Sequence, residues 1–102
     1  MENQFGERLR QLREANHLLQ RQVASMLDMD TPMLSKIERG DRKAKREHIL
    51  KLASIYKADS KELLTIWLAD QLFDLVKNEE VGLRAIKMTE EKINRKMLQK
   101  ND

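Results

Sequence analysis

The sequence predicts an all-α fold, and three observations favour it. Leu, Lys, Glu, Arg and Met dominate the 102 residues, and all five are good helix formers. Only three glycines and one proline are present, too few for the turns of a fold with many short strands. Apolar residues recur at helical spacing, beginning with Phe5, Leu9 and Leu12. The length fits one compact domain with an appended helix.

Four helices are expected in the first half of the chain. The first ends near Asn16 and His17, residue types that tolerate the left-handed conformation found at helix ends. Asp30 is a good N-cap for the third helix, Pro32 suits its first turn, and Gly40 is a natural terminator. The expected ranges are about 5–15, 20–27, 31–39 and 46–56.

Two further helices are expected in the second half. Asp59 or Ser60 caps a fifth helix that runs to Val76 and is apolar over much more than one face. Such a helix needs cover on more than one side, which a small domain can hardly supply, so a partner subunit is expected. After Glu80 a last helix carries scattered apolar residues among many charges.

The charge distribution suggests a polyanionic partner. The net charge is +3, and the sharpest basic excess lies in residues 36–51, where seven Lys or Arg face three Asp or Glu. A local basic patch of this kind is typical of nucleic-acid binding. A solvated charged surface is the alternative interpretation.

The residue composition disfavours several classes of function. The chain has no cysteine, and His17 and His48 have no partner at a recognised catalytic or metal-binding spacing. We therefore expect no enzyme activity, no metal and no cofactor. The polar N-terminus shows no signal peptide, and Asp70 and Asp74 interrupt the most apolar stretch, so neither secretion nor a membrane span is expected. The cytoplasm is the expected compartment.

Residues 20–40 carry the most informative motif. They form two short expected helices joined by a tight turn, with Ala24 small enough for the helices to approach. Met29, Leu34 and Ile37 are placed to hold the angle between them. This arrangement predicts a helix-turn-helix, the motif that inserts its second helix into the DNA major groove.

The same segment resembles a known family. Gln20-x-x-Val23-Ala24-x-x-Leu27, followed by Leu34-Ser-Lys-Ile-Glu-Arg-Gly40, is similar to the Cro/C1-type helix-turn-helix proteins of phage repressors and bacterial regulators, and the resemblance spans about residues 5–64. It implies a lambda-repressor-like five-helix DNA-binding domain over 1–64, with an additional C-terminal helix in an extension over 65–102. More loosely, the chain through 67–70 is similar to small regulators found near DNA methyltransferases.

The resemblance also implies roles for individual residues. Base contacts, which hydrogen-bonding groups and thymine-facing apolar groups can supply, would come from Thr31, Pro32, Met33, Ser35 and Lys36. Met33 packing inward is the alternative for that residue. Gln20 matches a family position that binds a phosphate. Beyond the resemblance, the basic residues Arg21, Arg42, Lys43 and Arg46 are expected to add phosphate contacts, with plain solvation as the alternative for the last three. Arg13 and Glu38 would form a structural ion pair between the first and third helices.

Some positions depart from the family pattern. His17 and Asp28 stand where relatives usually have Gly, and Leu19 stands where they usually have Ser or Thr, so Leu19 cannot cap the second helix. The usual Gln or Arg base reader is also missing. DNA shape and methyl contacts are therefore expected to carry more of the specificity.

The expected assembly is a homodimer on a palindromic double-stranded DNA site, acting as a repressor at the bacterial nucleoid. Its interface is expected in the C-terminal region, through Leu64, Trp67, Leu68, Phe73, Val76, Ile86 and Ile93. The alternative is an antitoxin-like or adaptor protein whose C-terminal helices bind a protein partner.

Overall fold

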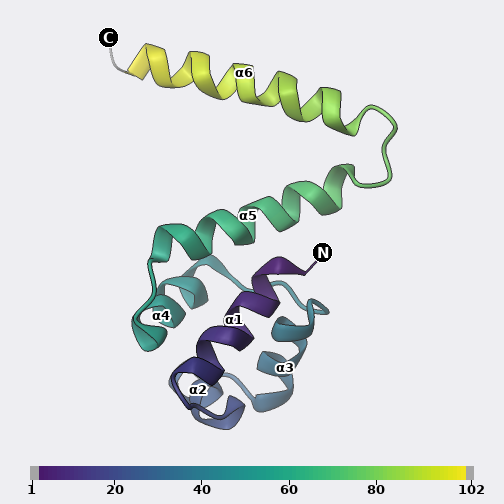
Figure 1. Cartoon of the computed structure of the whole chain (residues 1–102). Coiled ribbons are helices and arrows are strands. Elements are labelled where there is room, and N and C mark those ends of the chain that lie inside the picture. The colour runs from purple at the N-terminus through teal and green to yellow at the C-terminus, as the bar shows by residue number, and fades with distance from the viewer. Residues whose placement is uncertain (1–2, 101–102) are drawn as a thin grey trace. The chain divides into compact units, whose positions relative to one another are not determined.

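The computed structural model describes residues 3–100 and confirms the all-α prediction, because these residues form six helices and no strand (Figure 1). The helices are α1 (Gln4–Ala15), α2 (Gln20–Met26), α3 (Thr31–Arg39), α4 (Arg46–Tyr56), α5 (Ser60–Val76) and α6 (Gly82–Lys100). None of the described helices is long and apolar enough to cross a membrane.

The chain divides into two compact units, Met1–Gln71 and Leu72–Asp102. The first holds α1 to α4 and most of α5, and the second holds the end of α5 together with α6. The units therefore divide inside α5, C-terminal to the position 64 at which the sequence analysis ended the DNA-binding domain. Between these two positions, Trp67 and Asp70 contact other parts of the first unit, as described below.

The core of the first unit is built by all five of its helices. Its largest fully buried side chains are Leu9, Val23, Leu34, Ile49, Leu52 and Leu63. Among them, Leu9 belongs to the apolar positions at helical spacing in the first expected helix, and Val23 and Leu34 belong to the helix-turn-helix motif. Because Leu63 of α5 has no exposed surface, this helix is part of the domain and not an appendage to it.

The N-terminus of α1 is held by two polar side chains, its own N-cap Asn3 and the distant Asp70. The Asn3 Oδ1 accepts a hydrogen bond from the Gly6 backbone N–H at 3.1 Å, and Asn3 Nδ2 donates to the Glu38 backbone oxygen at 2.8 Å. From α5, Asp70 Oδ2 accepts from the Phe5 N–H at 2.9 Å. A carboxylate at a helix N-terminus satisfies free N–H groups and complements the helix dipole, so Asp70 joins α5 to α1.

Left-handed residues occur at the helix ends. Gly40 ends α3 with φ 84°, as expected for a C-terminal glycine. His17 and Asp28 have φ 56° and 54°, so these residues adopt the conformation that the family's usual glycines adopt more easily. Lys57 ends α4 with φ 54°, which the sequence did not indicate.

The second unit has little core of its own among the described residues. The turn after α5 is closed by backbone hydrogen bonds such as Glu79 N–H to the Val76 oxygen, at 2.9 Å. Within α6, Gly82 is buried and Ile86 is half-buried, while the residues from 87 to 99 are exposed. Large apolar side chains are exposed in this unit, namely Leu72, Phe73, Leu75, Val81, Leu83, Met88, Ile93, Met97 and Leu98.

Gly6 offers a test of how closely α1 and α3 approach. A Cβ at Gly6 would overlap the Glu38 backbone oxygen and the Asn3 side chain, so Gly6→Ala should lower the free energy of unfolding by about 1–3 kcal/mol. Helix propensity alone predicts the opposite sign. Urea unfolding of Gly6→Ala distinguishes the two expectations, with Gln11→Ala on the exposed side of α1 as the control. A stabilised Gly6→Ala protein would mean that α1 and α3 are less tightly packed than described.

Candidate nucleic-acid interface

The segment between residues 20 and 40 forms a helix-turn-helix of α2 and α3. After α2 the chain turns through Asp28, and the Met29 N–H donates to the Ala24 oxygen at 3.0 Å. Asp30 then caps α3 by accepting from the Met33 N–H at 2.8 Å. The turn is short because the left-handed Asp28 and the capping Asp30 reverse the chain within three residues.

The buried face of α3 fixes the direction of its exposed face. Leu34, Ile37 and Glu38 are buried against the rest of the first unit, and on the opposite side Pro32, Lys36 and Arg39 are exposed. A helix with one side anchored in the core and one side free can enter a groove without rearrangement.

The five predicted base-contact residues are not equally placed on α3. Lys36 and Pro32 are exposed, whereas Thr31, Met33 and Ser35 are half-buried. Met33 packs against the core cluster. It also borders a surface groove whose lining is Asp28, Met29, Asp30, Met33, Ile37, Arg42, Lys43, Lys45 and His48. Met33 is half-buried, so it contacts the core and also keeps exposed surface at this groove.

Arg39 is a candidate that the sequence analysis missed. Its guanidinium lies on the exposed side of α3, donating to Ser35 Oγ at 2.8 Å and to Asp41 Oδ2 at 3.1 Å. The signal was available in the sequence, because Arg39 is three residues after Lys36 on the expected helix and such residues share a face. Its exposed ion pair with Asp41 is weak, so the guanidinium can exchange this partner for DNA.

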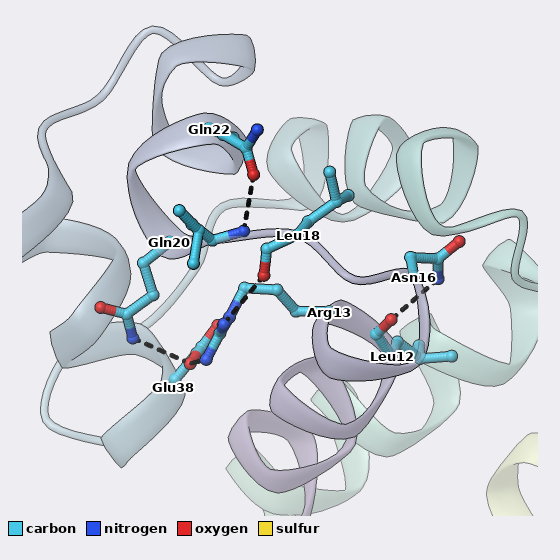
Figure 2. Close-up of polar contacts among 8 residues, drawn as sticks. Leu12, Arg13, Asn16, Leu18, Gln20, Gln22 and Glu38 are labelled. Atoms are coloured by element: carbon cyan, nitrogen blue, oxygen red, sulfur yellow. Dashed lines mark hydrogen bonds and ion pairs between the residues drawn. The ribbon is translucent and has the colours of Figure 1, made fainter.

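A buried ion pair joins α1 to α3 (Figure 2). Arg13 Nε and Nη2 donate to the two carboxylate oxygens of Glu38 at 2.8 and 3.1 Å. The Glu38 side chain is only 3 % exposed, and Arg13 Nη1 also donates to the Leu18 backbone oxygen at 3.1 Å. The hydrogen bond to Glu38 raises the pKa of Arg13 above its ordinary value. The structure thus contains the pair that the resemblance implied.

Gln20 extends this network to α2. Its Nε2 donates to Glu38 Oε1 at 3.0 Å (Figure 2), so the side chain points toward Glu38. The amide nitrogen has a second hydrogen, which this bond does not use. Arg21, the other predicted phosphate contact on α2, is exposed. Leu19 provides no side-chain cap, and instead Gln22 Oε1 accepts from the Leu19 N–H at 2.8 Å.

The remaining predicted phosphate contacts lie at the connection from α3 to α4. Arg42, Lys43 and Arg46 are all exposed, and Lys45 adds a fourth cation. The midpoint of this connection is held by Trp67 of α5, whose indole N–H donates to the Ala44 oxygen at 2.9 Å. The basic residues therefore belong to the same unit as α3.

The comparisons with known proteins agree with this geometry. Residues 4–65 match the helix-turn-helix domain family. The chain belongs to that family. Helix-turn-helix proteins read DNA with their second helix in the major groove, so this protein is a DNA-binding regulator and α3 is its recognition helix.

A solved structure gives a second, independent likeness. The restriction-modification controller protein C.AhdI from Aeromonas hydrophila is 37 % identical in sequence, with a TM-score of 0.56. The match covers 61 % of this chain and 90 % of that one. No curated protein matches the chain. The match leaves more than a third of this chain uncovered, so this chain has residues beyond the part that the two proteins share.

The residues predicted for a dimer interface fall into two groups. Leu64 and Trp67 are half-buried against the core of the first unit, so both have an intrachain role. Leu68, Phe73 and Ile93 are 50 %, 45 % and 52 % exposed. Val76 and Ile86 are half-buried. The exposed members are the ones available to a second chain.

The Tyr56 hydroxyl is a buried group that finds no hydrogen-bond partner within the described residues. Burial raises the pKa of this phenol, and the charge of Glu38 raises it further. An unpaired buried hydroxyl costs about 1–3 kcal/mol. Tyr56 therefore contributes to the core through its ring and not through its oxygen.

Tyr56→Phe should accordingly raise the free energy of unfolding by about 1 kcal/mol without changing DNA affinity. Because the folded-state pKa is raised, the wild-type protein should also lose stability as the pH rises past the ordinary tyrosine pKa of about 10, and the substitution should abolish that component. Denaturant titrations at pH 7 and at a pH above about 10 measure both effects. A less stable variant would show that the hydroxyl has a partner.

Proposed function

We propose that this protein is a transcriptional repressor that binds a palindromic DNA site as a homodimer. The observation that carries the proposal is the exposed face of α3, where Lys36 and Arg39 project from a helix anchored by Leu34, Ile37 and Glu38. The similarity to a restriction-modification controller protein supports a regulatory role. A protein that occupies promoter DNA acts where the chromosome is, which for a bacterial regulator is the nucleoid in the cytoplasm.

In the proposed interface, one group of residues contacts the DNA bases and another contacts the DNA phosphates. Lys36 donates to guanine O6 or N7 in the major groove, and Thr31, Ser35, Pro32 and Met33 contribute the remaining base contacts. Phosphates are bound by a second group, made up of Gln20, Arg21, Arg42, Lys43 and Arg46, to which we add Arg39 at the end of α3. Phosphate contacts fix the register of the protein on DNA, whereas base contacts determine the sequence.

Lys36→Ala should change which DNA sequence is preferred, at a cost of about 1–3 kcal/mol at one base position. Lys43→Ala and Arg46→Ala should instead weaken binding to all duplexes alike and lower the salt slope by about one unit each. The site is first selected from random duplexes with the wild-type protein, and each variant is then titrated against specific and scrambled DNA at several salt concentrations. Lys61→Ala, an exposed cation on α5, is the control. An unchanged specificity ratio for Lys36→Ala would contradict the assignment of the reading face.

The dimer is proposed from the apolar surface of the C-terminal region. Leu68 and Phe73 on α5 and Ile93 on α6 are about half exposed, and a single helix-turn-helix contacts too few base pairs for tight binding. Two copies related by a twofold axis double the contacts, on half-sites about 34 Å apart. Val76 and Ile86 are proposed for the same interface, and so are Leu64 and Trp67, which belong to the first unit.

Sedimentation of the full chain at micromolar concentration should show a dimer, and Phe73→Lys and Ile93→Lys should shift it to monomer because a buried charge destabilises an apolar interface. Met88→Lys is the matched control, since Met88 is 59 % exposed and lies on the other side of α6 from Ile93. A monomeric wild-type protein contradicts the proposal. A stoichiometric second protein that co-purifies through α6 would favour the antitoxin-like or adaptor alternative.

A further inference from the structure

The connection between α3 and α4 is the most basic exposed segment of the first unit, yet little backbone structure holds it. Residues 42–44 form no helix and no hydrogen-bonded turn, and Lys45, whose backbone oxygen accepts from the His48 N–H at 3.0 Å, gives α4 no side-chain cap. In the described part of the chain, one hydrogen bond reaches the backbone of residues 42–44, and it is the 2.9 Å bond from Trp67 Nε1 to the Ala44 oxygen. Ala44 itself is buried in the core, and the position of its backbone oxygen is fixed by a side chain from α5.

The same indole ring attracts the two cations that flank this bond. Lys43 Nζ lies 5.8 Å from the centroid of the Trp67 ring, and Arg46 Cζ lies 5.7 Å from it. Both distances are within the range of about 6 Å over which a cation interacts with an aromatic face. Trp67 thus contacts three of the four residues from 43 to 46: Ala44 through its N–H, and Lys43 and Arg46 through its ring.

Ordering of this kind matters for phosphate binding. Lys and Arg side chains are flexible, and fixing them at an interface costs conformational entropy. Holding the cations over a ring before DNA arrives reduces that cost. Lys43 and Arg46 remain exposed, so their N–H donors are still accessible to a phosphate.

We propose that Trp67 is a positioning residue for the DNA-backbone contact: it fixes the connection from α3 to α4 and orders Lys43 and Arg46 for phosphate. This inference rests on the proposed function, because it requires these two cations to meet DNA. It gives Trp67 a role beyond the dimer interface that the sequence analysis assigned to it.

Two substitutions separate the contributions of the indole. Trp67→Phe keeps an aromatic face but loses the N–H, so affinity for the selected duplex should fall about 5-fold, the effect of one hydrogen bond, with an unchanged salt slope. Trp67→Leu loses both features. Its affinity should fall more than about 10-fold, and its salt slope should fall by between one and two units, since each phosphate contact contributes about 0.9.

The salt slope distinguishes positioning from a loss of folding. A destabilised protein has fewer active molecules but makes the same phosphate contacts, so its slope stays that of the wild type. Thermal unfolding of each variant by circular dichroism sets a temperature at which all are folded, and the titrations are made there. A wild-type slope for Trp67→Leu overturns the proposal, and so does tighter binding, which would mean that the ring withholds the cations from DNA.

A double-mutant cycle completes the test. In a Lys43→Ala/Arg46→Ala background, Trp67→Leu should change affinity less than about 2-fold, because its partners are gone. In a Lys36→Ala background it should keep its full effect. Equal losses in both backgrounds overturn the inference alone, whereas a wild-type protein that selects no duplex contradicts the proposed function itself.

Discussion

The arrangement of the DNA-binding unit depends on the carboxylate of Glu38. This group lies on the recognition helix, is almost completely buried, and accepts hydrogen bonds from Arg13 of α1 and Gln20 of α2. A buried charge is tolerated only when it is paired and hydrogen-bonded. The carboxylate therefore penalises any arrangement in which α1, α2 and α3 move apart, and so it fixes the angle at which α3 is presented.

The functional surface follows from that constraint. Because Glu38 faces inward with Leu34 and Ile37, the other side of α3 faces outward with Lys36 and Arg39. Asn3 reinforces the same contact by binding the Glu38 backbone oxygen from the start of α1. From α5, Asp70 holds the N-terminus of α1 and Trp67 holds the connection after α3. The fifth helix thus stabilises both the scaffold and the basic segment beside the recognition helix.

Features encoded locally could be predicted from the sequence. Asp30, Pro32 and Gly40 carry the start and stop signals of α3, and apolar spacing located all six helices, because caps and periodicity act over a few residues. The contacts of Asp70 and Trp67 could not be predicted, since they join positions 65 and 23 residues apart and leave no local pattern. In the sequence, Asp70 is visible only as an interruption of an apolar stretch. The pairing of Arg13 with Glu38 came from family resemblance, not from spacing.

The most direct test of this account is the coupling energy between Arg13 and Glu38 in a double-mutant cycle. Urea unfolding would be measured for the wild-type protein, Arg13→Ala, Glu38→Ala and the double variant. Each single change leaves a largely buried charge without its ion-pair partner and should cost about 3–5 kcal/mol, and the coupling should reach about 2–3 kcal/mol. A coupling below about 0.5 kcal/mol, the level at which independent sites simply add, would contradict the claim that this pair fixes the recognition helix.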